Sequence, residues 1–172
     1  MKNFEFINVA IIGCGLIGSE WDHTNSLDSL PLTHARVFSE HKRAKLIALC
    51  DANEKKASNA AKFWNVKYFY SDPFQLFTNH QVDLLIIATS STARLIVIQQ
   101  ALAAGIKFFV IEKPLATTIS EAHEIVTALN AAGASCLVNF SRNWDPSMLE
   151  IKKRIAEGKT GAKLYDWWEI NQ

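Results

Sequence analysis

The sequence predicts an α/β fold, a doubly wound parallel β-sheet with helices on both faces. Three observations support this prediction. Short apolar, β-branched runs without polar alternation recur along the chain, as in strands that are buried on both faces of a sheet. Helical segments separate these runs, and such alternation implies parallel strands joined by crossovers. The first apolar run ends in glycines spaced G-x-G-x-x-G, where a strand would give way to a helix.

Local signals predict each element in turn. The six strands are expected at residues 6–12, 45–50, 67–70, 82–88, 107–111 and 135–140. The helices are expected at 34–41, 54–64, a short one from 73, 93–104, 120–132 and 146–157. Thr33 and Ser120 are the expected N-caps of the helices 34–41 and 120–132, and Gly105 and Gly133 follow the ends of the helices 93–104 and 120–132. Right-handed crossovers after a glycine-rich start favour the strand order 3-2-1-4-5-6.

Composition and charge narrow the class of protein. The chain has 172 residues, of which 49% are apolar and 20% charged, values typical of a soluble globular protein. A net charge of +1 gives no electrostatic reason to bind nucleic acid or an anionic membrane. Residues 1–6 lead directly into the first strand, so no signal peptide is expected. No apolar run approaches the roughly 20 residues that cross a bilayer. We therefore expect neither a nucleic-acid nor a membrane partner.

The cysteines and histidines favour a reducing environment and no metal. Cys14, Cys50 and Cys136 each lie within or beside an apolar run, so buried free thiols are expected. This pattern predicts a cytoplasmic protein. The five histidines are dispersed, and no pair with metal-ligand spacing has a third ligand nearby, so no metal site is predicted.

The glycine-rich segment 9–18 has the pattern of a dinucleotide-binding, or Rossmann, fingerprint. Gly13 would permit a tight turn, Gly15 would let backbone N–H groups approach a pyrophosphate, and Gly18 would let the helix pack close to the strand. The N–H groups of this turn, those of Leu16 and Ile17 included, are predicted to bind the cofactor. By itself the pattern is equally compatible with a purely structural turn.

Residues 19–32 do not continue the helix that normally follows this fingerprint. They are polar, show no helical or strand period, and end at Pro31 and Leu32. Either the helix is interrupted, or the segment is inserted between a short first turn and the main helix. Long loops are often functional, so this insertion could cover the cofactor or the substrate.

Asp51 ends the second predicted strand and would complete the fingerprint. Its carboxylate can accept hydrogen bonds from the adenosine ribose hydroxyls. The alternative is a structural N-cap for the next helix. The absence of arginine at position 52 favours NAD over NADP, although Lys55 and Lys56 could reach a 2′-phosphate.

Polar residues also follow the fourth and fifth strands. Thr89 and Ser90 begin a run of four hydroxyl residues, which would either line the ligand cleft or cap the next helix. Glu112 and Lys113 follow the fifth strand directly. Because the carboxyl ends of parallel strands meet at one edge of the sheet, Gly13, Asp51, Thr89 and Lys113 are expected to converge there.

With Glu112-Lys113-Pro114, the sequence resembles the glucose–fructose oxidoreductase / inositol dehydrogenase (Gfo/Idh/MocA) family. The matching segments are VAIIGCGLIG at 9–18, LIALCD at 46–51, IIATSS at 86–91, AGIKFFVIEKPLA at 104–116 and LVNFSRNWDPSM at 137–148. Two positions depart from the family pattern. Ser90 stands where proline is common, and Arg94 stands where histidine is frequent.

The resemblance implies an NAD(P)-dependent oxidoreductase that transfers a hydride to or from a sugar- or cyclitol-like alcohol. Lys113 would be the catalytic residue, near the nicotinamide ribose and the reacting hydroxyl. Asp51 would bind the adenosine ribose. Thr89, Ser90, Glu112, Asn139 and Arg142 would lie along the same cleft. NAD is the expected cofactor, and NADP is the alternative.

The resemblance also predicts the domain organisation. Residues 1–140 would form the dinucleotide-binding domain, and 141–172 a connecting helix and the first strand, 162–170, of a truncated α+β substrate domain. Because the acidic residue and histidine that complete the family's active site would follow residue 172, two other hypotheses stay open. The chain would be a non-catalytic dinucleotide-binding or oligomerising module, or a truncated product. Trp167 and Trp168 on strand 162–170 predict a homodimer through that strand.

Overall fold

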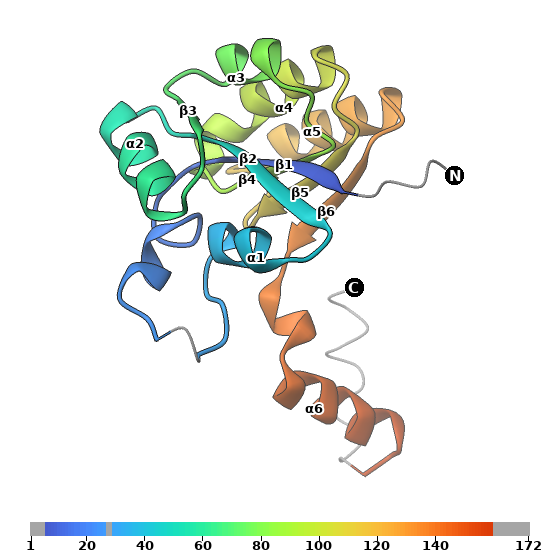
Figure 1. Cartoon of the computed structure of the whole chain (residues 1–172). Coiled ribbons are helices and arrows are strands. Elements are labelled where there is room, and N and C mark those ends of the chain that lie inside the picture. Colours follow the sequence, from blue (N-terminus) through green and yellow to red (C-terminus); the bar gives the residue numbers. More distant parts are fainter. Residues whose placement is uncertain (1–5, 27–28, 160–172) are drawn as a thin grey trace. The chain divides into compact units, whose positions relative to one another are not determined.

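The computed structural model describes residues 6–26 and 29–159, and confirms the doubly wound parallel sheet. The sheet has the predicted order β3-β2-β1-β4-β5-β6, and every neighbouring pair is parallel (Figure 1). The strands are β1 (Ile7–Ile12), β2 (Ala44–Cys50), β3 (Tyr68–Tyr70), β4 (Leu84–Ile87), β5 (Phe108–Glu112) and β6 (Ser135–Asn139). All six lie within or one residue beyond the predicted ranges, because unbroken apolar runs mark strands that are buried on both faces.

The helices α1 (His34–Glu40), α2 (Glu54–Phe63), α3 (Pro73–Asn79), α4 (Arg94–Ala103) and α5 (Ile119–Ala131) connect these strands. Thr33 caps α1 as predicted, since its side chain accepts a hydrogen bond from the Arg36 N–H. The cap predicted for α5 was wrong. Thr118, not Ser120, accepts the Glu121 N–H, so the N-cap of α5 lies two residues earlier than expected.

Two apolar layers hold the sheet between its helices. On one face, α3, α4 and α5 pack through buried residues that include Leu76, Ile98 and Ile125 (Figure 1). On the other face, α1 and α2 contribute Ala35, Ala60 and Ala61. The small alanines let these two helices pack closely against the sheet.

The chain divides into two compact units, Met1–Asn139 and Phe140–Gln172. The second unit contains a 3-10 helix, η3 (Ser141–Trp144), and helix α6 (Pro146–Ala156), which Asp145 caps through the Ser147 N–H. The predicted strand 162–170, its tryptophans and the dimer expected through it lie outside the described residues.

The cysteine prediction was partly wrong. Cys14 and Cys50 are buried free thiols as expected, but Cys136 is exposed on β6, the edge strand of the sheet. In the parts of the chain that the structure describes, no helix has the length and apolar character to span a membrane. Within the same parts, no three His, Cys, Asp or Glu side chains gather as a potential metal site.

Candidate cofactor-binding site

The turn after β1 is geometrically restricted to glycine at two positions. Gly13 has φ +101°, and a Cβ there would lie 2.5 Å from the carbonyl carbon of Ala88, just after β4. A Cβ on Gly18 would lie 2.0 Å from the Gly13 carbonyl oxygen. Both contacts are far too short for real atoms, so only glycine lets the chain fold back against the ends of β1 and β4.

Gly15 faces open space, since a Cβ there would meet nothing within 4 Å. Around it, the turn 15–18 presents unused donors. In the described part of the chain, no protein acceptor binds the backbone N–H groups of Gly15, Leu16, Ile17 and Gly18. Unpaired N–H groups at the start of a helix form an anion site. The turn therefore provides the donors and the space that a pyrophosphate requires.

This turn is also the first turn of the helix that follows. The His34 N–H donates to the Ile17 carbonyl at 3.1 Å, and the Ala35 N–H donates to the Gly18 carbonyl at 2.9 Å. Helix α1 thus stacks directly on the turn, although the insertion separates the turn from the helix in sequence. Of the two alternatives for residues 19–32, the structure supports an insertion between a short first turn and the main helix.

The insertion is held by a buried carboxylate. Asp22, in the 3-10 helix η1 (Glu20–His23), accepts hydrogen bonds from the Leu32 N–H at 2.9 Å and from the Thr33 N–H and hydroxyl, each at 2.7 Å. Its other oxygen accepts from Arg36 on α1 at 3.1 Å. Burial alone would raise the pKa of Asp22, but these hydrogen bonds outweigh it and lower the pKa to about 2. A charged Asp22 thus fixes both ends of the insertion.

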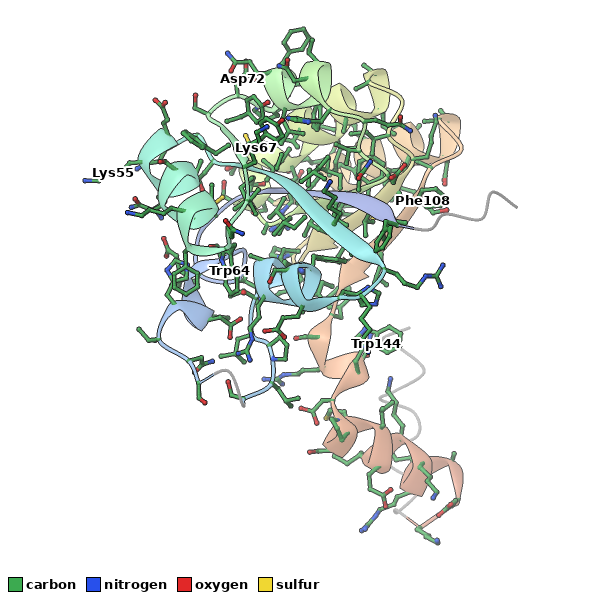
Figure 2. All side chains as sticks on the ribbon, in the orientation of Figure 1. Lys55, Trp64, Lys67, Asp72, Phe108 and Trp144 are labelled. Atoms are coloured by element: carbon green, nitrogen blue, oxygen red, sulfur yellow. The ribbon has the colours of Figure 1, made fainter. Side chains whose placement is uncertain are left out.

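The insertion packs against α2 and not over the predicted ribose site. The Trp64 indole N–H donates to the Ser19 hydroxyl at 2.9 Å, at the end of α2, where Figure 2 labels this tryptophan. His23 stacks on Phe63 with ring centroids 4.0 Å apart. No described residue of the insertion lines the cavity beside Asp51, and a role of the insertion in covering the cofactor or the substrate stays a prediction.

Asp51 joins the turn after β1 to the end of β2. One carboxylate oxygen accepts the Cys14 N–H at 2.9 Å, and the other accepts the Asn53 N–H at 2.9 Å. The N-cap alternative for Asp51 was wrong, because Asn53 caps α2 through the Lys56 N–H. Asp51 is only partly buried, so further lone pairs of its carboxylate stay available to a ligand.

A cavity of ≈ 470 Å³ collects the predicted binding residues of three strand ends. It is lined by Gly13 and Gly15 after β1, Asp51 after β2, and Thr89 and Ser90 after β4. The other predicted residues, Leu16, Ile17, Gly18, Glu112 and Lys113, do not line it. The convergence expected from the topology is therefore present for the part of the site nearest β1, β2 and β4.

The hydroxyl residues after β4 do not cap the next helix. The N-cap of α4 is Ala93, and no side chain bonds to the helix start. Instead, the Thr89 hydroxyl donates to the Ser90 carbonyl at 3.1 Å, and the Ser90 and Thr92 hydroxyls lie 3.1 Å apart. This geometry removes the capping alternative and leaves Thr89 and Ser90 on the cavity wall.

Glu112 lies at the end of β5 and is buried. Its carboxylate binds His34 of α1 at 2.9 Å and accepts from the Asn139 amide of β6 at 2.6 Å. Burial alone would raise the pKa of Glu112, but the hydrogen bonds from His34 and Asn139 lower it. The carboxylate predicted to bind a cofactor is therefore engaged with protein partners and connects α1 and β6 to the end of β5.

Lys113 extends from this framework and is exposed. No described residue pairs with its ammonium group. Arg142 belongs to the second unit, where it is exposed on η3. The cofactor and catalytic roles of these two residues stay predictions.

Arg94 binds the backbone on both sides of Lys113, a role that the sequence pattern did not reveal. This buried side chain donates to the backbone carbonyls of Glu112 and Pro114, and to that of Thr89 at 2.8 Å. Burial lowers the pKa of its guanidinium. Its Nε–H has no partner among the described residues. The one available signal was its departure from the histidine that the family often has at this position.

A parallel sheet of this order, with a glycine turn after β1 and an aspartate after β2, defines a dinucleotide-binding α/β protein. The family model for the Gfo/Idh/MocA proteins, described as an oxidoreductase family with an NAD-binding Rossmann fold, matches residues 7–140. The chain belongs to this family, and the resemblance drawn from the sequence is confirmed.

Named relatives agree with this assignment. The chain is 33% identical to inositol 2-dehydrogenase 2 of Saccharopolyspora erythraea and 34% identical to inositol 2-dehydrogenase of Paracoccus denitrificans. Each alignment covers 92% of the chain, but only 43% and 44% of the respective relative. The fold also matches scyllo-inositol dehydrogenase from Lactobacillus casei, solved with NAD(H) and scyllo-inositol. Its TM-score is 0.75 at 22% identity, over 91% of this chain and 42% of that one. The chain thus spans less than half the length of these relatives.

Proposed function

We propose that this chain is the cofactor-binding part of an NAD-dependent dehydrogenase that acts on a cyclitol- or sugar-like alcohol. The observation that supports this most directly is the turn 15–18, whose unpaired N–H groups adjoin the cavity beside Asp51. The turn would bind the pyrophosphate at the positive end of the α1 dipole. Asp51 would accept hydrogen bonds from the adenosine ribose, and Thr89 and Ser90 would lie toward the nicotinamide.

The described residues fit this cofactor. Gly15 leaves open the volume that any other residue would fill, and Asp51 offers an acceptor where a ribose hydroxyl needs one. When bound, the nicotinamide supplies a carbon, C4, that takes up or gives back a hydride. NAD fits better than NADP because the carboxylate of Asp51 would repel a 2′-phosphate.

The proposed chemistry at the other end of the site depends on Lys113. Its ammonium group is exposed at the end of β5, on a loop that Arg94 holds to the loop after β4. We propose that Lys113 orients the reacting hydroxyl and holds or accepts its proton as the hydride leaves the same carbon. Glu112 precedes Lys113 directly. Its carboxylate is held by His34 and Asn139, and we propose that this anchoring positions Lys113.

The names of the relatives support a substrate class. Two are named inositol 2-dehydrogenases and another structure holds scyllo-inositol, so a polyhydroxylated ring is the proposed substrate. None of the three is named as a non-catalytic module, so they give that alternative no support.

Two experiments test the proposal on the 172-residue chain. Titration of NADH fluorescence should saturate at submillimolar cofactor, whereas a folded sample without saturation would overturn cofactor binding. Reduction of NAD⁺ is then measured with myo- and scyllo-inositol. Turnover with either inositol would overturn the non-catalytic alternative, whereas NADH binding without turnover would be expected of a cofactor-binding part alone.

A further inference from the structure

An ion pair joins the insertion to the first turn of α2. The Glu20 carboxylate of η1 lies 3.7 Å from the Lys56 ammonium group. Both side chains are partly exposed, at 37% for Glu20 and 48% for Lys56. Together with Cys14 and His23 they line a small cavity of ≈ 260 Å³ on the flank of the glycine turn.

This pair lies close to the predicted ribose site. Cys14 connects the two places, because its N–H donates to Asp51 while the same residue lines the cavity of Glu20 and Lys56. Burial raises the pKa of the Cys14 thiol most, and the charges of Asp51 and Glu20 are among those that raise it further. Two carboxylates from different segments thus act on one short stretch of the turn.

NAD and NADP differ only by a phosphate on the adenosine ribose, so the charges around Asp51 decide between them. Lys55 and Lys56, at the start of α2, are the cations that could bind a 2′-phosphate. Figure 2 shows Lys55 pointing away from the protein, where it is exposed. Lys56 lies in the first turn of α2, which follows Asp51 closely in sequence, but its ammonium group is paired with the Glu20 carboxylate.

We propose that Glu20 is a specificity-determining residue, which excludes NADP by pairing with Lys56 and withholding it from the 2′-phosphate. This inference rests on the proposed cofactor function of the chain. Glu20 belongs to the insertion, so the insertion adds a second selection against the phosphate to that of Asp51. Glu20 would act from the small cavity beside the glycine turn, and it does not line the cavity that the ribose would occupy.

The test compares the affinities for NADH and NADPH by fluorescence titration of the 172-residue chain. Wild type should bind NADH more tightly. In Glu20→Gln, Lys56 is released and one repulsive charge is removed, so the affinity for NADPH should rise roughly 5- to 20-fold. The affinity for NADH should stay within about twofold of wild type. The double variant Glu20→Gln/Lys56→Met should lose most of the gain for NADPH.

Glu124→Gln on α5 is the matched control, because it makes the same change in net charge on another helix. It should leave both affinities unchanged. The inference is overturned if Glu20→Gln does not change the ratio of affinities, if the double variant keeps the full gain, or if Glu124→Gln gives the same gain. Wild type that prefers NADPH would also overturn it. Folded wild type that binds neither cofactor would instead refute the proposed function, and this inference with it.

Discussion

Two glycine-to-alanine substitutions separate the structural role of the turn after β1 from its proposed binding role. At Gly18 an added Cβ would lie 2.0 Å from the Gly13 carbonyl oxygen, whereas at Gly15 it would meet no protein atom within 4 Å. The chemical change is the same and the positions are three residues apart. Gly18→Ala should therefore destabilise the fold, whereas Gly15→Ala should weaken ligand binding without destabilising the fold.

The magnitudes follow from these contacts. Overpacking a rigid site costs about 1–3 kcal/mol, and at Gly18 the obstructing atom belongs to the backbone, so we expect about 3 kcal/mol. That loss is a large part of a total stability of about 5–15 kcal/mol. Gly15 is not in a left-handed conformation, so alanine there should stabilise the protein by about 0.4–1 kcal/mol through the unfolded state. Its Cβ would occupy the approach of the pyrophosphate, and we expect NADH affinity to fall at least tenfold, about 1.4 kcal/mol.

Urea unfolding and NADH titration of each variant give the two readings. The reasoning is refuted at the site if Gly15→Ala binds NADH as tightly as wild type, because the open N–H groups would then not face the phosphates. It is refuted in the fold if Gly18→Ala loses less than about 0.5 kcal/mol, since the close approach to Gly13 would not exist.

Three further predictions concern single side chains. Arg94→Met removes the donors to three backbone carbonyls and should cost about 3 kcal/mol in urea unfolding, at about 1 kcal/mol for each hydrogen bond. The Arg94→His variant should lose less. Asp22 has its pKa lowered from 3.8 to about 2, so its stabilisation is present above pH 4 and is lost as the pH falls toward 2. Wild type should therefore exceed Asp22→Asn in stability at neutral pH, and this advantage should shrink between pH 4 and 2 by on the order of 2 kcal/mol. Lys113→Met should change stability by less than about 0.5 kcal/mol but reduce turnover of inositol at least about 100-fold.

Each of these predictions has a clear contrary result. Arg94→Met as stable as wild type would mean that the loops after β4 and β5 do not depend on this side chain. If the stability difference between wild type and Asp22→Asn stays constant down to pH 2, the pKa of Asp22 is not lowered in the folded protein. Lys113→Met with wild-type turnover would remove Lys113 from the chemistry.

The sheet could be predicted from sequence because its determinants are local. An apolar strand buried on both faces leaves an unbroken run, and the glycines mark where β1 must turn. The residues after β1, β2 and β4 then converge through topology alone, as the cavity beside Asp51 shows. The errors arose where two local signals compete. Thr118 and Ser120 can both cap a helix, but only Thr118 has a glutamate three residues later, the spacing of a capping box.

Other features depend on contacts that no local pattern contains. The run that includes Cys136 is as apolar as the buried strands, but β6 lies at the sheet edge, where Leu137 is also exposed. In the sequence, Arg94 looks like an ordinary first residue of a helix. Only the fold brings the carbonyls of Glu112, in β5, and Pro114, just after it, to the Arg94 side chain. In the sequence, Glu112 looks like a carboxylate that faces a ligand. In the fold, its partners are His34 from α1 and Asn139 from β6.

The insertion combines both cases, and its structure shows how a fingerprint tolerates an interruption. The carbonyl groups of the turn 15–18 need donors if the turn is to act as a helix start, and the N–H groups of His34 and Ala35 donate to them as if no residues intervened. Asp22 makes this possible by binding Thr33 at the return point of the chain and Arg36 within α1. The helix dipole of α1 thus still ends at the turn. The sequence around Asp22 has no helical or strand period because the insertion is stabilised by hydrogen bonds between its two ends and not by an apolar face. An insertion that leaves the anion site intact while placing Glu20 beside Lys56 is free to alter which cofactor the site accepts without altering how the phosphates are bound.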